Sequence, residues 1–571
     1  MTPTLRTAVS FGVCALAMCG ASRGQTRAEA SEGRAPSADA DFRVAGIVVN
    51  ANTGAPLDRV DVTLGVAGSD REDAATTTGE DGSFVFDGLK QGKYSVVASR
   101  RGFGTAAYQM HEGGFFTGIV TGPNLDTSHL HFQLTPAAIL NGSVSDDAGD
   151  PVPSAMVTLF RQLGSSGPNN VVRMRTDTTD DAGAFEFTRL EPGTYFVSVS
   201  ARPWYAFHPQ PRQRFVNGKE EEEELPRSPL DVAYPITFYA DATDSNAATP
   251  IALKAGDHPQ MSLTMHAVQA VQLQIKMPQP EGDPREAQWR GFVFPTISQS
   301  VFGIMENAIQ TQGGGRTGTD GQMVFEISGL APGEYTLEFH GQNGQSQGSK
   351  QVDLKGDLMF NGLSAAATAG TEVHGTLAMA FGARAPDDLN VTLAPVNGQR
   401  RGNGQKIAEN GTFTFKDVEP GFYELIVVGG GRQLPVLQIR TAGREIEGGR
   451  IQIGSDPITL AATAAEGSAT VNGFAKRNGQ GKGGAMVALV PRHPGANRYL
   501  FRRDQSDSDG SFSLYRIVPG RYTLIAIEDG WELEWVREVV LQKYLAQGMQ
   551  LDIREDTTKI DLSEPIEVQV R

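Results

Sequence analysis

The chain is poor in cysteine, because its only two, Cys14 and Cys19, both lie within the first 19 of 571 residues. Everything that follows them therefore folds without a disulfide bond. Hydrophobic residues make up 39% of the chain, which is enough for several packed cores. A chain of this length is also too long for one domain of about 100–200 residues. We therefore expect several domains, each stabilised by its own hydrophobic core.

Basic charge is also scarce, since the formal net charge at pH 7 is -16 and the chain has no long run of Lys and Arg. Nucleic acids are bound through clustered basic side chains, so no nucleic-acid partner is expected. The short pairs Arg400-Arg401 and Arg502-Arg503 are interpreted as solvated strand ends or loops.

Long apolar runs are missing apart from "AVSFGVCALAMC" at 8–19. This run follows Arg6 and precedes the small residues Gly20 and Ala21, a pattern typical of a cleaved export signal, which we predict at 1–21. It is too short for a permanent transmembrane helix, which needs about 20 apolar residues. We expect the rest of the chain to be exported, as a periplasmic, outer-membrane associated or secreted protein.

Cys19 leaves two interpretations of the N-terminus open. The tetrapeptide "LAMC" (16–19) resembles the bacterial lipobox, whose cysteine carries a lipid, although Met18 stands where Gly, Ala or Ser is usual. Ordinary secretion without a lipid is the alternative. Lipidation of Cys19 would be the only attachment to a membrane. Residues 22–41 contain no large apolar side chain and are predicted to form a disordered leader.

Recognisable catalytic and metal-binding motifs are missing as well. None of the nine histidines begins an H-x-x-E or H-E-x-x-H arrangement. His129 and His131 lie two residues apart without further ligands nearby, so we expect half-buried strand histidines there. The stretch "DQSDSDG" (504–510) suggests a calcium loop, but it contains Gln505 and no Glu follows at the twelfth position. A polar hairpin turn is predicted there, and we predict no enzyme activity, metal or cofactor.

One motif is abundant and occurs five times. The copies are "DGSFVFDGLKQGKY" (81–94), "AGAFEFTRLEPGTY" (182–195), "DGQMVFEISGLAPGEY" (320–335), "NGTFTFKDVEPGFY" (410–423) and "DGSFSLYRIVPGRY" (509–522). Four copies share identical spacings, and the third has two extra residues after Gly321. The repeated positions are Gly82, Phe84, Phe86, Gly92 and Tyr94, then Gly183, Phe185, Phe187, Gly193 and Tyr195, then Gly411, Phe413, Phe415, Gly421 and Tyr423, and finally Gly510, Phe512, Leu514, Gly520 and Tyr522.

Each motif is interpreted as structure, with two turns between three strand segments. Asp-Gly and Asn-Gly favour a hairpin turn, because glycine adopts positive φ without steric cost. Aromatic residues two apart, such as Phe84 and Phe86, lie on one face of a strand and are predicted to fill a core. A second turn, in which Gly92 is left-handed, then leads into the strand that Tyr94 opens.

The surroundings of the motif extend the same interpretation. Upstream partners have a glycine near the start of a strand, as in "VAGIVV" (44–49) and "LNGSV" (140–144). About seven short strands in roughly 100 residues are typical of an antiparallel β-sandwich. The gap after the second copy holds "EEEEE" (220–224), interpreted as a solvated loop, and "YPITFY" (234–239), interpreted as an added strand. One short helix is predicted at 536–547.

The whole pattern, G-x-V…G-x-P…V-x-L followed by D-G-x-F-x-F…L-x-P-G-x-Y, resembles the carboxypeptidase regulatory-like domain, and especially its tandem, exported bacterial versions. The resemblance covers about 42–571 and implies an all-β fold, a tandem array of about five antiparallel Ig-like or transthyretin-like β-sandwiches. In zinc carboxypeptidases this module follows a separate catalytic domain, for which no residues remain here. The predicted domains are sandwich 1 at 42–135, sandwich 2 with an insertion at 136–267, a divergent sandwich 3 at 268–365, sandwich 4 at 366–464 and sandwich 5 at 465–571.

The resemblance also implies a function, because the fold is commonly grouped with carbohydrate-binding folds. We predict an exported, non-enzymatic binding protein of the cell envelope with a glycan as its leading ligand class. The alternative is a structural stalk or protein-interaction scaffold whose partner is an envelope protein. Exposed, coplanar Trp and Tyr rings would favour a glycan, whereas burial would indicate core residues. The candidate binding residues are Trp204, Tyr205 and Phe207 in sandwich 2 and Trp531 and Trp535 in sandwich 5.

Overall fold

The structure is a computed structural model that describes most of the chain beyond residue 41. The described residues are 42–69, 71–111, 114–163, 171–209, 212–216, 219–223, 228–276, 294–307, 312–317, 323–340, 346–361, 371–396, 403–418, 420–533, 535 and 537–571. The predicted signal peptide, Cys19, the leader and Gly321 lie outside them. Asp41–Arg571 form one compact unit.

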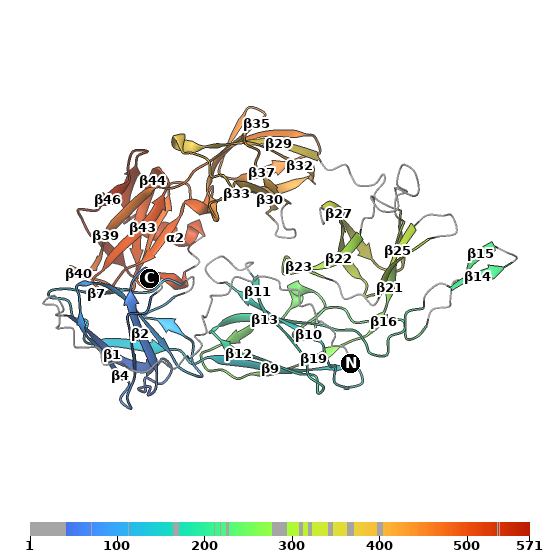
Figure 1. The fold of residues 1–571 in the computed structure, drawn as a ribbon, viewed down its shortest axis with the longest axis horizontal. Helices are drawn as coiled ribbons and strands as arrows, with labels where there is room; N and C mark the ends of the chain where they lie inside the picture. Colours follow the sequence, from blue (N-terminus) through green and yellow to red (C-terminus); the bar gives the residue numbers. More distant parts are fainter. Residues whose placement is uncertain are drawn as a thin grey trace, which may run out of the picture. The chain divides into compact units, whose positions relative to one another are not determined.

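The described residues fold as five β-sandwiches that follow one another along the chain, numbered 1 to 5 here (Figure 1). Each has its own cluster of buried hydrophobic side chains. One α-helix, α2 (Glu538–Leu545), lies inside the segment predicted to be helical. The predicted fold class is therefore confirmed, while the domain limits stay predictions.

Sandwiches 1 and 2 contain the first two copies of the motif. In sandwich 1, one sheet has β1 (Phe42–Asn50), β4 (Ser83–Leu89) and β8 (Leu130–Leu134), and the other has β2 (Asp61–Val66), β3 (Ala74–Thr77), β5 (Gly92–Ser99), β6 (Ala106–Ala107) and β7 (Ile119–Thr121). In sandwich 2, one sheet has β9 (Ala138–Asp146), β12 (Ala184–Leu190) and β19 (Gln260–Met265), and the other has β10 (Met156–Gln162), β11 (Val171–Thr178), β13 (Gly193–Ser200), β17 (Thr237–Phe238) and β18 (Ile251–Leu253).

Sandwiches 3 and 4 contain the next two copies. In sandwich 3, one sheet has β21 (Val271–Lys276), β24 (Gln312–Thr317), β25 (Met323–Leu330) and β28 (Leu358–Asn361), and the other has β22 (Phe294–Val301), β23 (Ile304–Asn307), β26 (Gly333–His340) and β27 (Ser346–Leu354). In sandwich 4, one sheet has β29 (Thr371–Met379), β32 (Thr412–Val418), β35 (Val436–Thr441), β36 (Arg444–Glu447) and β38 (Ile458–Ala464), and the other has β30 (Asn390–Pro395), β31 (Asn403–Lys406), β33 (Gly421–Gly429), β34 (Arg432–Leu434) and β37 (Arg450–Ile453).

Sandwich 5 contains the last copy, and one strand joins its two layers. One layer has β39 (Ala469–Arg477), β40 (Gln480–Gly481), β43 (Ser511–Ile517) and β46 (Lys559–Asp561), and the other has β41 (Met486–Pro491), β42 (Arg502–Gln505), β44 (Gly520–Ile527) and β45 (Met549–Ile553). The final strand, β47 (Ile566–Gln569), pairs with both β39 and β44.

The pairing differs from the purely antiparallel sandwich expected from the sequence. In every sandwich a strand near its end lies parallel to its first strand, as β8 does to β1 and β19 to β9. A parallel pair requires a long crossover connection, which a tight hairpin cannot supply. Here the strands of the second sheet lie on that connection, so each sandwich begins and ends in the same sheet.

The insertion in sandwich 2 also differs from its prediction in one part. Most of the glutamate run, interpreted as a loop, lies in strand β15 (Lys219–Glu223), which forms a hairpin with β14 (Arg212–Val216). The alternating segment at 234–239 does add a strand, because β17 pairs with β13. The short strands β16 (Val232–Ala233) and β20 (Val268–Gln269) pair nearby.

In sandwiches 1, 2 and 4 the motif has two phenylalanines, and both lie in the core of their sandwich. The ring centroids of Phe84 and Phe86 are 6.2 Å apart, and both side chains are buried. The distance is 5.6 Å for Phe413 and Phe415, whose rings are at 63°. These tilted or edge-on arrangements suit aromatic pairs, which avoid face-to-face stacking.

A glycine on the first strand makes room for the first of these phenylalanines. Gly142 lies directly opposite Phe185, and Gly375 lies opposite Phe413. A Cβ atom at Gly375 would be only 2.0 Å from the Phe413 ring, and one at Gly142 only 2.4 Å from the Phe185 ring. The upstream glycine noticed in the sequence is therefore needed for packing, because only a residue without a side chain leaves this volume free.

A β-bulge follows the two core positions of the motif, which are Phe84 and Phe86 in sandwich 1, at the same place in all five sandwiches. In sandwich 1, Asp87 and Gly88 together lie opposite the single residue Arg43. The extra residue reverses the alternation of the strand, so that Leu89 packs on the core three residues after Phe86. The bulge contains a left-handed residue in four sandwiches, namely Gly88 (φ 72°), Arg189 (φ 58°), Gly329 (φ 75°) and Arg516 (φ 55°).

This bulge leads to a stability prediction that involves backbone conformation alone. A Cβ at Gly88 would meet nothing within 4 Å, so Gly88→Ala should cost sandwich 1 about 1 kcal/mol solely through left-handed strain. Arg189→Gly is the matched reverse change and should stabilise sandwich 2 by up to about 1 kcal/mol. Hydrogen exchange of each sandwich within the intact chain measures both effects. Equal exchange in Gly88→Ala and the wild type would contradict the assignment of strain.

The second turn of the motif also differs from its prediction. Gly92 was expected to be left-handed, but it begins β5, and the left-handed residue lies four positions earlier in the bulge. The Tyr94 ring passes over Gly92, and its hydroxyl donates a 3.0 Å hydrogen bond to the carbonyl oxygen of Lys90. The same bond is made by Tyr195 to Glu191 at 2.8 Å, by Tyr335 to Ala331 at 2.6 Å and by Tyr522 to Val518 at 2.8 Å.

Buried tyrosines of this kind tie the start of a strand to the preceding turn. Burial raises the pKa of Tyr522 to about 12, so its hydroxyl keeps the proton that it donates. A similar tyrosine corner joins two strands in immunoglobulin-type sandwiches. Gly520 before it leaves room for the ring, just as Gly92 does in sandwich 1.

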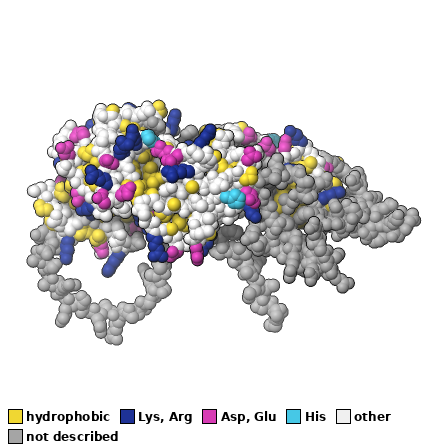
Figure 2. Space-filling view, turned by 90° about the horizontal axis from the view of Figure 1, so that it is seen from above, with side chains coloured by type: hydrophobic (Ala, Val, Ile, Leu, Met, Phe, Trp, Pro, Cys, Tyr) yellow, Lys and Arg dark blue, Asp and Glu magenta, His cyan; other side chains and the backbone are white. Residues whose placement is uncertain are grey.

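The surface of the described chain carries charges of both signs. Figure 2 shows Lys and Arg interspersed with Asp and Glu over one face. Opposite charges form exposed ion pairs, for example Arg440 with Glu445 at 3.0 Å. Within the described residues, no helix is long and apolar enough to cross a bilayer.

Candidate functional site

The structure separates the candidate aromatic residues into two groups. In sandwich 2, the side chains of Trp204 and Phe207 are 82% and 58% exposed, and Tyr205 is partly buried. The Trp204 and Tyr205 rings lie 5.7 Å apart at 89°, so they form an edge-to-face pair and not a coplanar platform. The segment therefore presents single aromatic rings to solvent.

This exposed segment is anchored to the body of sandwich 2. Phe207 donates a 2.8 Å backbone hydrogen bond to Leu230, and the buried imidazole of His208 lies 2.6 Å from the carboxylate of Asp231. The anchoring contacts flank the exposed rings directly, so the rings project from a fixed backbone. Isolated exposed apolar residues are common, but two large aromatic side chains on one anchored turn suit an interaction surface.

The second group lies where sandwich 5 contacts sandwich 1, and this corrects its interpretation as a sugar platform. Trp531 is only 6% exposed, and its ring packs against Phe115 of sandwich 1 at a centroid distance of 4.6 Å. Trp535 is partly buried beneath the guanidinium of Arg503, 3.9 Å from the ring centroid. Trp531 thus leaves almost no surface for a ligand, and Trp535 has Arg503 over its ring and Phe501 edge-on at 5.4 Å.

The pair Arg502-Arg503 was predicted to be solvated, but Arg503 packs against aromatic rings. Its guanidinium lies 5.3 Å from the Phe115 ring centroid and 5.4 Å from that of Trp531. Arg502 donates hydrogen bonds to backbone carbonyls, including that of Arg516 at 2.9 Å. Both arginines are thus part of the structure of sandwich 5 and of its contact with sandwich 1.

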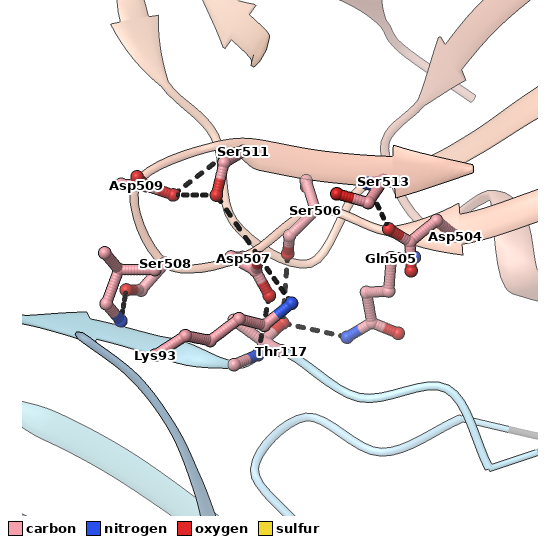
Figure 3. Close-up of polar contacts among 12 residues, drawn as sticks. Lys93, Thr117, Asp504, Gln505, Ser506, Asp507, Ser508, Asp509, Ser511 and Ser513 are labelled. Atoms are coloured by element: carbon pink, nitrogen blue, oxygen red, sulfur yellow. Dashed lines mark hydrogen bonds and ion pairs between the residues drawn. The ribbon is translucent and has the colours of Figure 1, made fainter. Parts of the chain in front are cut away.

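The polar half of this contact is formed by residues 504–511, which are the end of β42, the turn after it and the first residue of β43 (Figure 3). The Nζ atom of Lys93 lies 2.7 Å from Oδ2 of Asp507, whose side chain is only 5% exposed. The backbone N–H of Gly118 donates to Oδ1 of the same carboxylate at 3.1 Å. One aspartate of sandwich 5 thereby pairs with a cation and a backbone donor of sandwich 1.

The neighbours of Asp507 extend the contact. Gln505 donates from Nε2 to the carbonyl oxygen of Gln109 and to Oγ1 of Thr117, each at 2.8 Å. The Ser508 backbone N–H donates to the carbonyl oxygen of Gly118 at 2.9 Å, and Ser508 Oγ accepts from Val120 N at 2.9 Å. Figure 3 shows these side chains converging from β42 and its turn onto the first sandwich.

Burial dominates the electrostatics of this contact. It raises the pKa of Asp507, while the hydrogen bond and charge of Lys93 act in the opposite direction. Burial also raises the pKa of Asp504 and lowers that of His111. A neutral His111 suits its position, because its ring stacks on Trp531 at 5.6 Å and 11°.

The turn at 504–511 is therefore neither the exposed polar hairpin that we predicted nor a calcium loop. Gln505, Ser506 and Asp507 are buried. Gln505 and Asp507 direct polar side-chain atoms at sandwich 1, whereas the Ser506 hydroxyl bonds to Lys482 within sandwich 5. Among the described residues, no group of three or more His, Cys, Asp or Glu side chains is arranged to hold a metal ion. The strand histidines expected to be half-buried are exposed, and His129 pairs with Asp126 at 2.8 Å.

The sequence reasoning missed this contact because its two halves are almost 400 residues apart. One signal was available, since the acid-rich turn at 504–510 lacks the residues of a calcium loop and so required another explanation. A second signal was the glycine-rich aromatic segment "GGFFTG" at 113–118, whose glycines permit close approach of another backbone.

Comparison with known proteins identifies part of the chain. The carboxypeptidase regulatory-like domain model matches residues 43–135 and 139–210. A search among curated proteins found no match. Similar solved structures include the Bacillus anthracis TIE protein (13% identity, 76% of each chain covered, TM-score 0.16) and GBS52, the minor pilin of Streptococcus agalactiae (14% identity, 43% of this chain and 100% of that chain, TM-score 0.19).

A Streptococcal ancillary pilin is similar as well, at 10% identity over 51% of this chain and 98% of that chain, with a TM-score of 0.18. TM-scores this low carry no argument about function. The family match instead covers two complete copies of the repeated motif, together with the bulge and the tyrosine contact of each. Residues 43–135 and 139–210 thus give two tandem matches to the carboxypeptidase regulatory-like domain.

Proposed function

We propose that this chain is an exported, non-enzymatic scaffold for protein–protein interaction at the cell envelope, with the segment around Trp204 as its contact surface. The observation that carries the proposal is the exposure of Trp204 and Phe207 on one anchored turn. Large aromatic side chains of this kind supply much of the binding energy when they enter a pocket of a partner protein. The non-enzymatic role is supported by the regulatory-like domains, a module separate from the catalytic domain in zinc carboxypeptidases.

Glycan binding is the second candidate, favoured by the exposed indole of Trp204. A sugar ring can stack on one such face. The perpendicular ring of Tyr205 does not extend that face into a flat surface, which is why a protein partner ranks first.

Binding of the labelled chain to isolated envelopes of the source cell tests the proposal. Trp204→Ala should weaken binding at least tenfold, corresponding to the roughly 1.4 kcal/mol or more expected of an aromatic anchor. Phe422→Ala removes another exposed aromatic side chain, this one from sandwich 4, and should change nothing. Protease treatment of the envelopes should abolish binding. Loss of binding after periodate oxidation of sugars, but not after proteolysis, would instead establish the glycan candidate.

A further inference from the structure

Sandwich 5 contacts one segment of sandwich 1, described at residues 109–111 and 114–120, largely through its main chain. Its contacts use the carbonyl oxygen of Gln109, both main-chain groups of Gly118 and the N–H of Val120. The partners are Gln505 at the end of β42 and Asp507 and Ser508 in the turn that follows. Recognition of main-chain groups by a fixed set of side chains is how many protein domains bind extended peptides.

The same segment supplies two ring anchors at the other side of the contact. His111 stacks on Trp531, and Phe115 packs on the same indole at 4.6 Å. Trp531 is held from behind by the buried cluster that includes Phe501 and Leu541 of sandwich 5. Aromatic anchors surrounded by polar contacts are the usual composition of a specific interface.

Glycines on both sides allow the backbones to approach this closely. A Cβ at Gly118 would lie 2.7 Å from Oδ1 of Asp507, and one at Gly484 would lie 2.8 Å from Oε1 of Gln109. The Gly118 position lies in the recognised segment, and Gly484 lies in the surface that receives it. The complementarity is therefore a property of both partners and not of Lys93 and Asp507 alone.

Some polar atoms buried in the contact lose hydration without gaining a hydrogen bond, and this favours dissociation. Oε1 of Gln505 and Nε1 of Trp531 are buried without a hydrogen-bond partner among the described residues. Both atoms would be hydrated if the segment left, as would the buried carboxylate of Asp507. Separation therefore recovers solvation that association removes, and this keeps the net affinity of the contact moderate.

We infer that sandwich 5 carries a peptide-recognition surface, formed by Gln505, Asp507, Ser508 and Trp531, and that residues 109–111 and 114–120 of a second copy of this chain can occupy it. Every chain carries the surface once and the segment once, in different sandwiches. Two copies can therefore exchange segments, each binding the other in the manner in which one chain binds itself. Within one chain, the tether gives the chain's own segment a high effective concentration at the surface. The segment of a second copy therefore displaces it more often as the protein concentration rises.

Disulfide trapping in the full chain tests this inference, with Cys14→Ser and Cys19→Ser removing the only native thiols. Val120→Cys and Ser508→Cys place thiols on residues joined by a hydrogen bond across the contact. When the two changes are on separate chains, oxidation should give a mixed dimer that increases with concentration. When both are on one chain, oxidation at low concentration should give a monomer with an internal disulfide, and a disulfide-linked dimer should increase as the concentration is raised.

Two controls separate exchange from random collision. Val539→Cys puts an exposed thiol on α2 of sandwich 5, away from the contact residues named above, and should give little dimer with the Val120→Cys chain. Phe115→Ala in the Val120→Cys chain removes an anchor and should reduce the mixed dimer at least fivefold. Internal disulfide formation without mixed dimer above the Val539→Cys level would overturn exchange, and absence of the internal disulfide would overturn the surface itself.

Discussion

Replacement of Phe413 by alanine should destabilise sandwich 4 by about 3–5 kcal/mol, the usual cost of removing a buried phenylalanine side chain. Phe413 is 5% exposed and packs both on Phe415 and over Gly375. Neither neighbour can fill the space, because Gly375 has no side chain and Phe415 is itself fully buried. Against a typical domain stability of about 5–15 kcal/mol, this loss is severe.

Hydrogen exchange of β32 and β33 in the intact chain provides the measurement, since it follows sandwich 4 separately from the other four. Phe422→Ala is the matched control, because this aromatic residue lies in β33 of the same sandwich but is exposed. Its effect should stay within about 0.5 kcal/mol. Similar exchange rates in Phe413→Ala and Phe422→Ala would show that the motif phenylalanine does not determine the stability of the core.

The motif could be interpreted from the sequence because its signals are local. A turn glycine such as Gly82, two aromatic residues two apart and a tyrosine ten residues after Phe84 all lie within the short stretch 81–94. Spacing alone therefore predicts strands, a core face and a repeated sandwich. The glycine of the first strand was noticed as part of the pattern, but its purpose depends on the register that places Gly375 opposite Phe413.

The bulge was missed because its left-handed residue varies in type. Gly88 and Gly329 agree with the usual preference for glycine, whereas Arg189 and Arg516 adopt the same conformation without it. Tertiary pairing with the first strand imposes this conformation on residues whose local preference opposes it. The spacing of the motif was correct, but the left-handed position was assigned to the wrong residue.

The candidate binding residues were beyond sequence reasoning for a different reason. Trp204 and Trp531 are the same residue type in similar polar surroundings, yet one is exposed and the other packs against Phe115. That difference arises from a contact between chain segments more than 400 residues apart, which no local pattern records. Composition identifies aromatic candidates, and only tertiary structure decides which of them can meet a partner.

Gly375→Ala should destabilise sandwich 4 by about 1–3 kcal/mol or more, although it adds only one methyl group. The added Cβ would lie 2.0, 2.2 and 2.7 Å from three atoms of the Phe413 ring, so the ring or the strand has to move. The ring cannot move freely, because Phe415 and the rest of the sandwich core surround it. Gly375→Ala thus destabilises the core by adding volume, whereas Phe413→Ala destabilises it by removing volume.

A double-mutant cycle distinguishes this steric clash from a loss of stability that alanine would cause in the strand independently of Phe413. Phe413→Leu should cost stability by itself, but it also vacates the ring volume that the new methyl group needs. The double variant should therefore be more stable than the sum of the two single changes predicts, by about 0.5–3 kcal/mol. Gly404→Ala in β31 is the matched control, since the nearest atom to a Cβ there is 3.5 Å away. Additive effects in the cycle would mean that Gly375 is required by its backbone and not by the phenylalanine opposite it.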